Sequence, residues 1–339
     1  MTTFKYQGIM PKYVYQEIEL PFESKTRTFC GDFQNETRKL FLKFDALNGE
    51  QLEKFDSEKL TYTADKIFHY AKREVFQVLC DYLAWAFVFD DYLETLDEEA
   101  AEEAIETAMK IGNGELVLNG NVEFYPLYAV FSDIWSRMAQ VSPLEWQQRF
   151  MKSIYKWLAF AKIFGFHNRA GETQSVAQFS AFRWFDIGTD FMLDLIEFSS
   201  QKFLPASVRE DSVLKYLQHT LGNIIYTTND IFSFEKELNL GLLSNSVIVY
   251  AKEYEIPEQE ALDKAFNFLR GQIKSYVALQ KQMHQFIDCD NDVVQSYIHG
   301  MNYIIRGNYD LCRKSVRYYG GIEATSKRRR SITIPVISF

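Results

Sequence analysis

The 339-residue chain is predicted to be an all-α protein with about ten helices in one domain. Gly (16) and Pro (7) are scarce, so residues that interrupt helices are few. Apolar residues recur at helical spacing from near Glu36 almost to the end, while strand-like alternation bounded by turn signals is nearly absent. We expect one domain over 1–339, with an irregular segment at about 1–20 and a C-terminal lid or tail at about 320–339.

Three helices carry the clearest boundary signals. The acidic, Ala-rich stretch Asp97–Met109 predicts an amphipathic surface helix. Ser142-Pro143-Leu144-Glu145 is typical of a capping box, with proline at the first helical position, and predicts a helix to about residue 164. Pro257 is expected to open another helix, which ends near residue 287.

The composition excludes several classes of protein. Hydrophobic residues make up 47%, which excludes disorder, and the net charge of −9 argues against nucleic acid as a partner. The four cysteines show no paired spacing, which indicates reduced thiols rather than disulfides or a zinc site. No apolar run suits a signal peptide or a bilayer span. We therefore expect a cytoplasmic protein without stable membrane association.

The first acidic cluster is Asp90-Asp91-Tyr92-Leu93-Glu94, which follows the apolar run 84–89. On a helix, Asp90 and Glu94 are four residues apart and share a face with Asp91 beside them. Carboxylates at the C-terminal end of a helix repel one another and oppose its dipole, so a bound cation would stabilise them. Taken alone, the cluster could equally be a solvated helix end.

The second cluster extends from Asn229 to Glu237. Asn229, Ser233 and Glu237 recur every four residues, so they share one helix face and offer an amide, a hydroxyl and a carboxylate oxygen. Oxygen ligands without His or Cys suit Mg²⁺, which usually completes its coordination with water and substrate phosphate. With Lys236 beside Glu237, this cluster predicts a magnesium site.

Together these clusters resemble the two metal-binding motifs of class I terpene synthases. Asp90-Asp91-x-x-Glu94 is similar to their aspartate-rich motif, and the second cluster is similar to their NDxxSxxxE motif, 139 residues further on. The resemblance covers about 21–319. It implies a microbial-type enzyme with a single α domain, in which a helical bundle surrounds a central apolar cavity.

Two further segments match the family. Arg183 resembles its diphosphate-sensing arginine, with Asp186 as the linker and Ile187-Gly188 at a helix break. Arg317-Tyr318 resembles its RY pair, which binds diphosphate as the site closes. The resemblance therefore implies that Arg183, Lys236, Arg317 and Tyr318 bind the diphosphate.

The resemblance also implies the reaction. The substrate would be an acyclic prenyl diphosphate held by three Mg²⁺ ions, with farnesyl favoured over geranylgeranyl diphosphate. Ionisation would leave a carbocation, which aromatic ring faces can stabilise, and aromatic residues are 16% of the chain. The product would be cyclic, with release of diphosphate. Many relatives are monomers or dimers, so the resemblance implies a monomer or a homodimer.

Helical spacing predicts residues of the cavity wall. Leu83 and Phe87 precede Asp90 by one or two turns, and Ile225 and Tyr226 precede Asn229. Phe179 precedes Arg183 in the same way. For each of these, burial in the core is the competing interpretation.

Two other functions remain open from the sequence. A chain-elongating prenyltransferase shares the expected fold but has two aspartate-rich motifs. A non-catalytic helical protein could bind prenyl diphosphates at a site that no longer turns them over.

Overall fold

The computed structural model describes residues 12–27, 31–118 and 126–319. All regular structure within these ranges is helical, which confirms the predicted fold class. The helices are α1 (Gly31–Lys43), α2 (Gly49–Glu58), α3 (Thr61–Ile67), α4 (Arg73–Glu94), α5 (Glu98–Gly112), α6 (Pro126–Ala139), α7 (Leu144–Ala170), α8 (Val176–Asp186), α9 (Thr189–Ser200), α10 (Ala206–Arg209), α11 (Ser212–Asn239), α12 (Ser246–Glu253), α13 (Glu258–Gln282), the 3-10 turn η1 (Met283–Gln285), α14 (Asp292–Lys314) and α15 (Val316–Tyr319). Short helices such as α10 and α15 raise the number above the expected ten.

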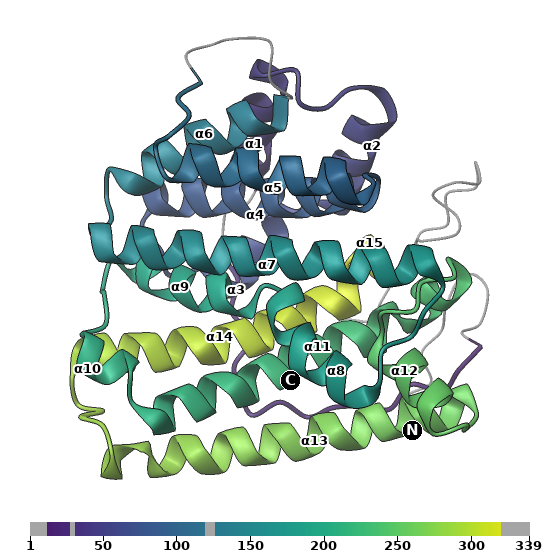
Figure 1. Ribbon diagram of the computed structural model, residues 1–339. Helices are drawn as coiled ribbons and strands as arrows, with labels where there is room; N and C mark the ends of the chain where they lie inside the picture. The colour runs from purple at the N-terminus through teal and green to yellow at the C-terminus, as the bar shows by residue number, and fades with distance from the viewer. Residues whose placement is uncertain (1–11, 28–30, 119–125, 320–339) are drawn as a thin grey trace.

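The long helices pack side by side in two groups (Figure 1). In the upper group, α4 packs against α6, and in the lower group α11 packs against α13 and α14. The helix α7 runs across the front between the groups and also packs against α4. The two acidic clusters lie on α4 and α11, so they belong to different groups of the bundle.

Residues 12–27 form no helix and cover part of the lower group. The ring of Tyr13 lies 4.9 Å from that of Phe234 on α11, and Gln16 donates a hydrogen bond to Asp263 on α13. Ser24 donates a hydrogen bond to Asp310 on α14. The predicted irregular segment therefore has contacts of its own where the structure describes it, whereas 1–11 and the proposed lid at 320–339 lie outside the described residues.

The predicted capping box before α7 is wrong. Pro143 is extended and occupies the N-cap position itself, so Ser142 lies one residue too early to cap the helix. Its hydroxyl instead donates a hydrogen bond to the carbonyl oxygen of Met138. A capping box is formed at Ser175 and Gln178, where α8 begins. The helix α7 continues to Ala170, beyond the predicted end, and stops where Gly171 adopts a φ of 69°.

Most aromatic side chains belong to the core rather than to a site. Trp85 stacks on Phe89 and Phe131, and Trp146 stacks on Phe150. All five are fully or almost fully buried. Burial of this much aromatic surface stabilises the bundle, and each stacked pair adds about 1 kcal/mol beyond area alone.

Two further findings concern the described part of the chain. Cys80, Cys289 and Cys312 are free thiols. None of the described helices combines the length with the apolar character that crossing a bilayer requires.

Candidate active site

A cavity of about 270 Å³ lies between the two groups of helices and brings the two acidic clusters together. It is lined from α3, α4, α7, α8, α9, α11, α14 and α15, and the residues predicted to bind metal or diphosphate come from α4, α8, α11 and α15. Its wall contains every residue predicted to bind metal or diphosphate: Asp90, Asp91, Glu94, Arg183, Asn229, Ser233, Lys236, Glu237, Arg317 and Tyr318.

Most of the remaining wall is apolar. Leu83 and Phe87 on α4, Ile225 on α11 and Ile187 after α8 line it as predicted, and Asp186 stands among the polar groups. The wall also includes apolar side chains that sequence reasoning did not single out: Ile67, Trp157, Phe164, Phe191, Met192 and Ile304.

Three predicted cavity residues lie outside this wall: Phe179, Tyr226 and Gly188. Phe179 and Tyr226 are buried in a separate small cluster with Phe164 and Val249. Tyr226 follows Ile225 directly on α11, so its side chain is rotated about 100° around the helix from the one that lines the cavity. Phe179 lies on α8, which packs between α7 and α12 as well as against α11.

The role of Gly188 is conformational: it forms the break between α8 and α9. Its φ is 75°, a conformation that suits glycine, and a Cβ atom there would come within 2.1 Å of the Phe191 ring. The predicted break is therefore present. Arg183 and Asp186 on α8, before the break, and Phe191 on α9, after it, line the same cavity.

The first acidic cluster is divided between a paired and an unpaired carboxylate. Asp91 binds Arg317 at 2.7 Å and Lys54 at 2.6 Å. Burial raises its pKa, but these two cations outweigh that effect and hold the pKa at about 2. Within the described residues, Asp90 forms no side-chain hydrogen bond or ion pair, and burial together with nearby Glu94 raises its pKa well above the usual range.

The second acidic cluster is largely buried on α11. Asn229 donates a hydrogen bond to the Tyr318 hydroxyl at 2.9 Å, and Ser233 is 1% exposed. Burial and the neighbouring Asp230 raise the pKa of Glu237 to about 7. Several oxygens thus face one cavity with too little positive charge nearby, a donor set that fits a hard divalent cation.

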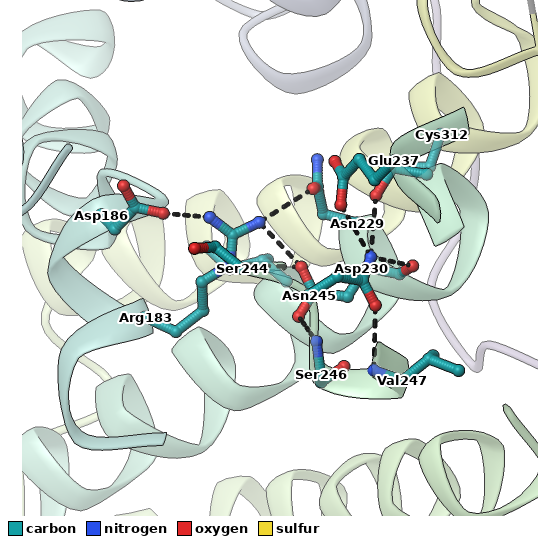
Figure 2. Close-up of polar contacts among 12 residues, drawn as sticks. Arg183, Asp186, Asn229, Asp230, Glu237, Ser244, Asn245, Ser246, Val247 and Cys312 are labelled. Atoms are coloured by element: carbon teal, nitrogen blue, oxygen red, sulfur yellow. Dashed lines mark hydrogen bonds and ion pairs between the residues drawn. The ribbon is translucent and has the colours of Figure 1, made fainter. Parts of the chain in front are cut away.

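Arg183 is the centre of a buried polar cluster (Figure 2). Its guanidinium donates to Asp230 at 2.7 and 3.1 Å, to the Asn229 side-chain oxygen at 3.2 Å and to Asp186. These acceptors raise the arginine pKa despite burial, so the side chain stays cationic. Asp230 also accepts a hydrogen bond from the backbone N–H of Ser246, which ties α12 to the cluster.

Arg317 and Tyr318 reach the cavity from α15. The Arg317 guanidinium lies over the Phe87 ring at 5.0 Å and pairs with Glu58 at 3.2 Å as well as with Asp91. The helix α2 thus supplies both Glu58 and Lys54 to the polar rim of the site. No group of three or more His, Cys, Asp and Glu side chains in the described ranges is close enough to hold a metal without other ligands.

Sequence reasoning also missed four residues that contact the polar groups of this site. Asp230 stands inside the second motif, beside Asn229, and its position offered a signal. Lys54, Glu58 and Asn245 belong to no recognised motif, and only the packing of α2 and α12 against the site brings them in.

Comparison with known proteins agrees with this fold and identifies the family. Residues 81–275 match the sequence model described as terpene synthase family 2, C-terminal metal binding. This segment is more than half of the chain and contains both acidic clusters and Arg183. The chain belongs to this family of terpene synthases, as the motif resemblance implied.

Individual relatives are distant but span most of the chain. The (+)-T-muurolol synthase of Roseiflexus castenholzii is 26% identical over 268 residues, which cover 77% of this chain and 81% of the relative. The germacrene A synthase of Nostoc punctiforme is 24% identical over 305 residues, or 88% and 93% of the two chains. The crystal structure of a-eudesmol synthase has the same fold, with a TM-score of 0.79 at 22% identity over 89% of this chain and 100% of that one.

Proposed function

We propose that the chain is a Mg²⁺-dependent sesquiterpene synthase that cyclises farnesyl diphosphate and releases diphosphate. The observation that carries this proposal is the shared cavity, where both acidic clusters and two arginines surround one polar region and the rest of the wall is apolar. Such a site has one part suited to metal and diphosphate and another suited to a hydrocarbon chain.

The identity of the substrate is supported by the relatives. The name of the T-muurolol synthase specifies (2E,6E)-farnesyl diphosphate, and that of the 7-epi-alpha-eudesmol synthase of Streptomyces viridochromogenes does the same.

The metal site would use oxygens from both clusters. Asp90, Asp91 and Glu94 on α4 and Asn229, Ser233 and Glu237 on α11 are the proposed ligands for Mg²⁺, three ions in all. Bound Mg²⁺ would supply positive charge that makes diphosphate a better leaving group.

The protein itself would bind and orient the leaving group. Arg183 and Arg317 are fixed cations at the cavity wall, and Lys236 and Tyr318 stand beside the second cluster. Departure of diphosphate would leave an allylic carbocation among Phe87, Trp157 and Phe191, whose ring faces stabilise positive charge without reacting with it. The released diphosphate can accept the final proton, so no other base is required.

The free thiols and acidic composition support a cytoplasmic protein. We propose that it acts there as a monomer or homodimer, without a nucleic-acid partner.

Product analysis tests the proposal. Purified protein is incubated with geranyl, farnesyl or geranylgeranyl diphosphate and Mg²⁺, and extracts are examined by gas chromatography and mass spectrometry. We expect cyclic C15 hydrocarbons or alcohols from farnesyl diphosphate alone. Longer diphosphates formed only when isopentenyl diphosphate is added would support a prenyltransferase instead, and binding without turnover would support a non-catalytic protein.

A further inference from the structure

Asn245 is a buried residue beside the second acidic cluster that none of the roles above includes. It precedes α12, and its side chain is completely inaccessible to solvent. Its side-chain oxygen accepts a hydrogen bond from the Val247 N–H at 2.9 Å and so caps α12. Its amide nitrogen points the other way, toward α11 (Figure 2).

That amide nitrogen touches two proposed metal ligands. It donates to a carboxylate oxygen of Glu237 at 2.8 Å and lies 3.4 Å from the hydroxyl oxygen of Ser233. It also donates to the backbone carbonyl oxygen of Asp230 at 2.8 Å. The two hydrogens of the amide are thus directed to the backbone and the ligand-bearing face of α11.

The cap fixes which end of the amide faces the site. If the side chain flipped, its oxygen would face the Glu237 carboxylate and the Asp230 carbonyl, and the Val247 N–H would lose its acceptor. The one arrangement that satisfies every partner therefore presents a donor to Glu237. One oxygen of the Glu237 carboxylate therefore accepts a hydrogen bond from Asn245, and Glu237 itself lines the cavity.

We propose that Asn245 is a positioning residue for the metal site, which holds Glu237 and Ser233 in the orientation that binds Mg²⁺. The inference rests on the proposed function only in assigning Mg²⁺ to these two ligands. Groups that orient metal ligands by hydrogen bonding are commonly worth a factor of about 10 to 100 in metal affinity or activity. Asn245 requires no contact with the ion or the substrate for this role.

Replacing Asn245 by serine separates its two contacts. Serine caps a helix about as well as asparagine, so the Val247 N–H keeps an acceptor, but its shorter side chain does not extend to Glu237. Asn291 provides the matched control, because it caps α14 through the Val293 N–H at 2.9 Å and lies on an exposed part of the surface away from the cavity. Asn291→Ser thus makes the same change of cap without touching the site.

Metal binding is measured by calorimetry, with Mg²⁺ titrated into the full-length protein in the presence of inorganic diphosphate. We expect Asn245→Ser to raise the apparent Kd for Mg²⁺ by about 10- to 100-fold, while Asn291→Ser leaves it unchanged. Circular dichroism establishes the temperature at which both variants are fully folded. If Asn245→Ser does not fold, Asn245→Thr is used, because its methyl group fills more of the buried space.

A second measurement distinguishes positioning from a general loss of structure. If Asn245 acts through the metal ligands, raising Mg²⁺ to saturation restores product formation in the folded variant, which a damaged fold would not allow. Unchanged Mg²⁺ binding in a folded Asn245 variant overturns the inference, even if its melting temperature falls. If the Asn245 variant binds Mg²⁺ more weakly but the wild-type protein itself makes no terpene, this inference stands and the proposed function is refuted instead.

Discussion

Arg183 shows how much a single buried charge depends on its partners. Its side chain is 10% exposed, and the Asp230 carboxylate that receives two of its hydrogen bonds is completely buried. Asp186 is the other carboxylate in contact with it. Without Asp230, Asp186 would be the remaining carboxylate in contact with this buried cation, and a buried charge that loses a partner costs more than the pair itself contributes.

Asp230→Asn is therefore expected to destabilise the fold by about 3 kcal/mol, measured as the free energy of unfolding in urea. Asp56→Asn is the control, because Asp56 pairs with Arg38 at the surface, where both side chains are more than a third exposed. That change should cost at most about 1 kcal/mol. Equal effects of the two substitutions would show that Arg183 does not depend on Asp230.

The second acidic cluster yields a prediction about activity. Asn229→Ala and Glu237→Ala should each abolish terpene formation, because each removes an oxygen proposed to bind Mg²⁺, while the circular dichroism spectrum stays helical. Glu235→Ala is the control, since Glu235 lies on the same helix but outside the cavity wall. Full product yield from both test variants would refute the metal assignment.

Single residues also show what helical spacing can and cannot predict. Leu83 and Ile225 line the cavity as expected, and each lies a multiple of about 3.5 to 4 residues from its motif. Tyr226 and Phe179 were equally apolar and close in sequence, yet they are buried against α7 and α12. Spacing defines the face of one helix, whereas only packing decides which neighbouring helix that face meets.

At the scale of the elements, the break between α8 and α9 depends on one glycine, Gly188. Gly188→Ala is expected to destabilise the protein by about 1–3 kcal/mol and to change the product pattern, because the added methyl displaces Phe191 from the cavity wall. Gly171 is the matched control, since its φ is 69° but nothing lies within 4 Å of the added atom.

Urea unfolding and product analysis of both glycine variants measure these effects. Gly171→Ala should cost about 1 kcal/mol through backbone strain alone and leave the products unchanged. If the two alanine variants behave alike, the contact with Phe191 has no influence on the cavity.

The helices α7 and α9 are joined by a buried ionic clamp. Arg149 on α7 donates to Asp194 and Glu197 on α9, at 2.6 Å in each case. Burial raises the pKa of Glu197 to about 7 although Arg149 opposes this, and the other ionisable groups facing it are Asp194 and Tyr297. Because the folded pKa is above the unfolded value near 4.5, Glu197 contributes stability at low pH that is lost as pH rises toward 7.

Glu197→Gln should therefore reduce the fall in unfolding free energy between pH 5.5 and pH 8 by about 2 kcal/mol. Urea titrations at the two pH values measure this fall in the wild-type protein and the variant. Glu103→Gln changes an exposed glutamate on α5 and serves as the control, with the wild-type dependence on pH retained. A variant that keeps the full wild-type dependence would show that Glu197 does not titrate in this range.

At the scale of the whole molecule, the sequence predicted the fold class and the convergence of two distant motifs. Asp90 and Asn229 are 139 residues apart and line one cavity. The contribution of α2 was not predictable, because Lys54 and Glu58 lie on a surface-like amphipathic helix and acquire a role only through their contacts with Asp91 on α4 and Arg317 on α15. Motif spacing specifies chemistry along the chain, whereas such contacts depend on tertiary packing.

The same convergence predicts how ligands affect overall stability. Mg²⁺ together with inorganic diphosphate should raise the melting temperature, because Mg²⁺ neutralises the repulsion between the carboxylates of α4 and α11 and diphosphate completes its coordination. At 100 times the dissociation constant the expected stabilisation is about 2.7 kcal/mol. Thermal unfolding with both components, with each alone and with a chelator checks this, and equal melting temperatures in all four would contradict it.

The segment that precedes α1 has a consequence for how the chain is made. Val14 and Gln16 bond to Gln259 and Asp263, and Ser24 bonds to Asp310, so these contacts span more than 240 residues. During synthesis at about 5–20 residues per second, the segment must wait roughly 10–60 seconds for its partners to leave the ribosome. It is among the last parts of the protein to dock. A bulky amino-terminal fusion would therefore slow folding more than a carboxy-terminal fusion placed beyond the described helices.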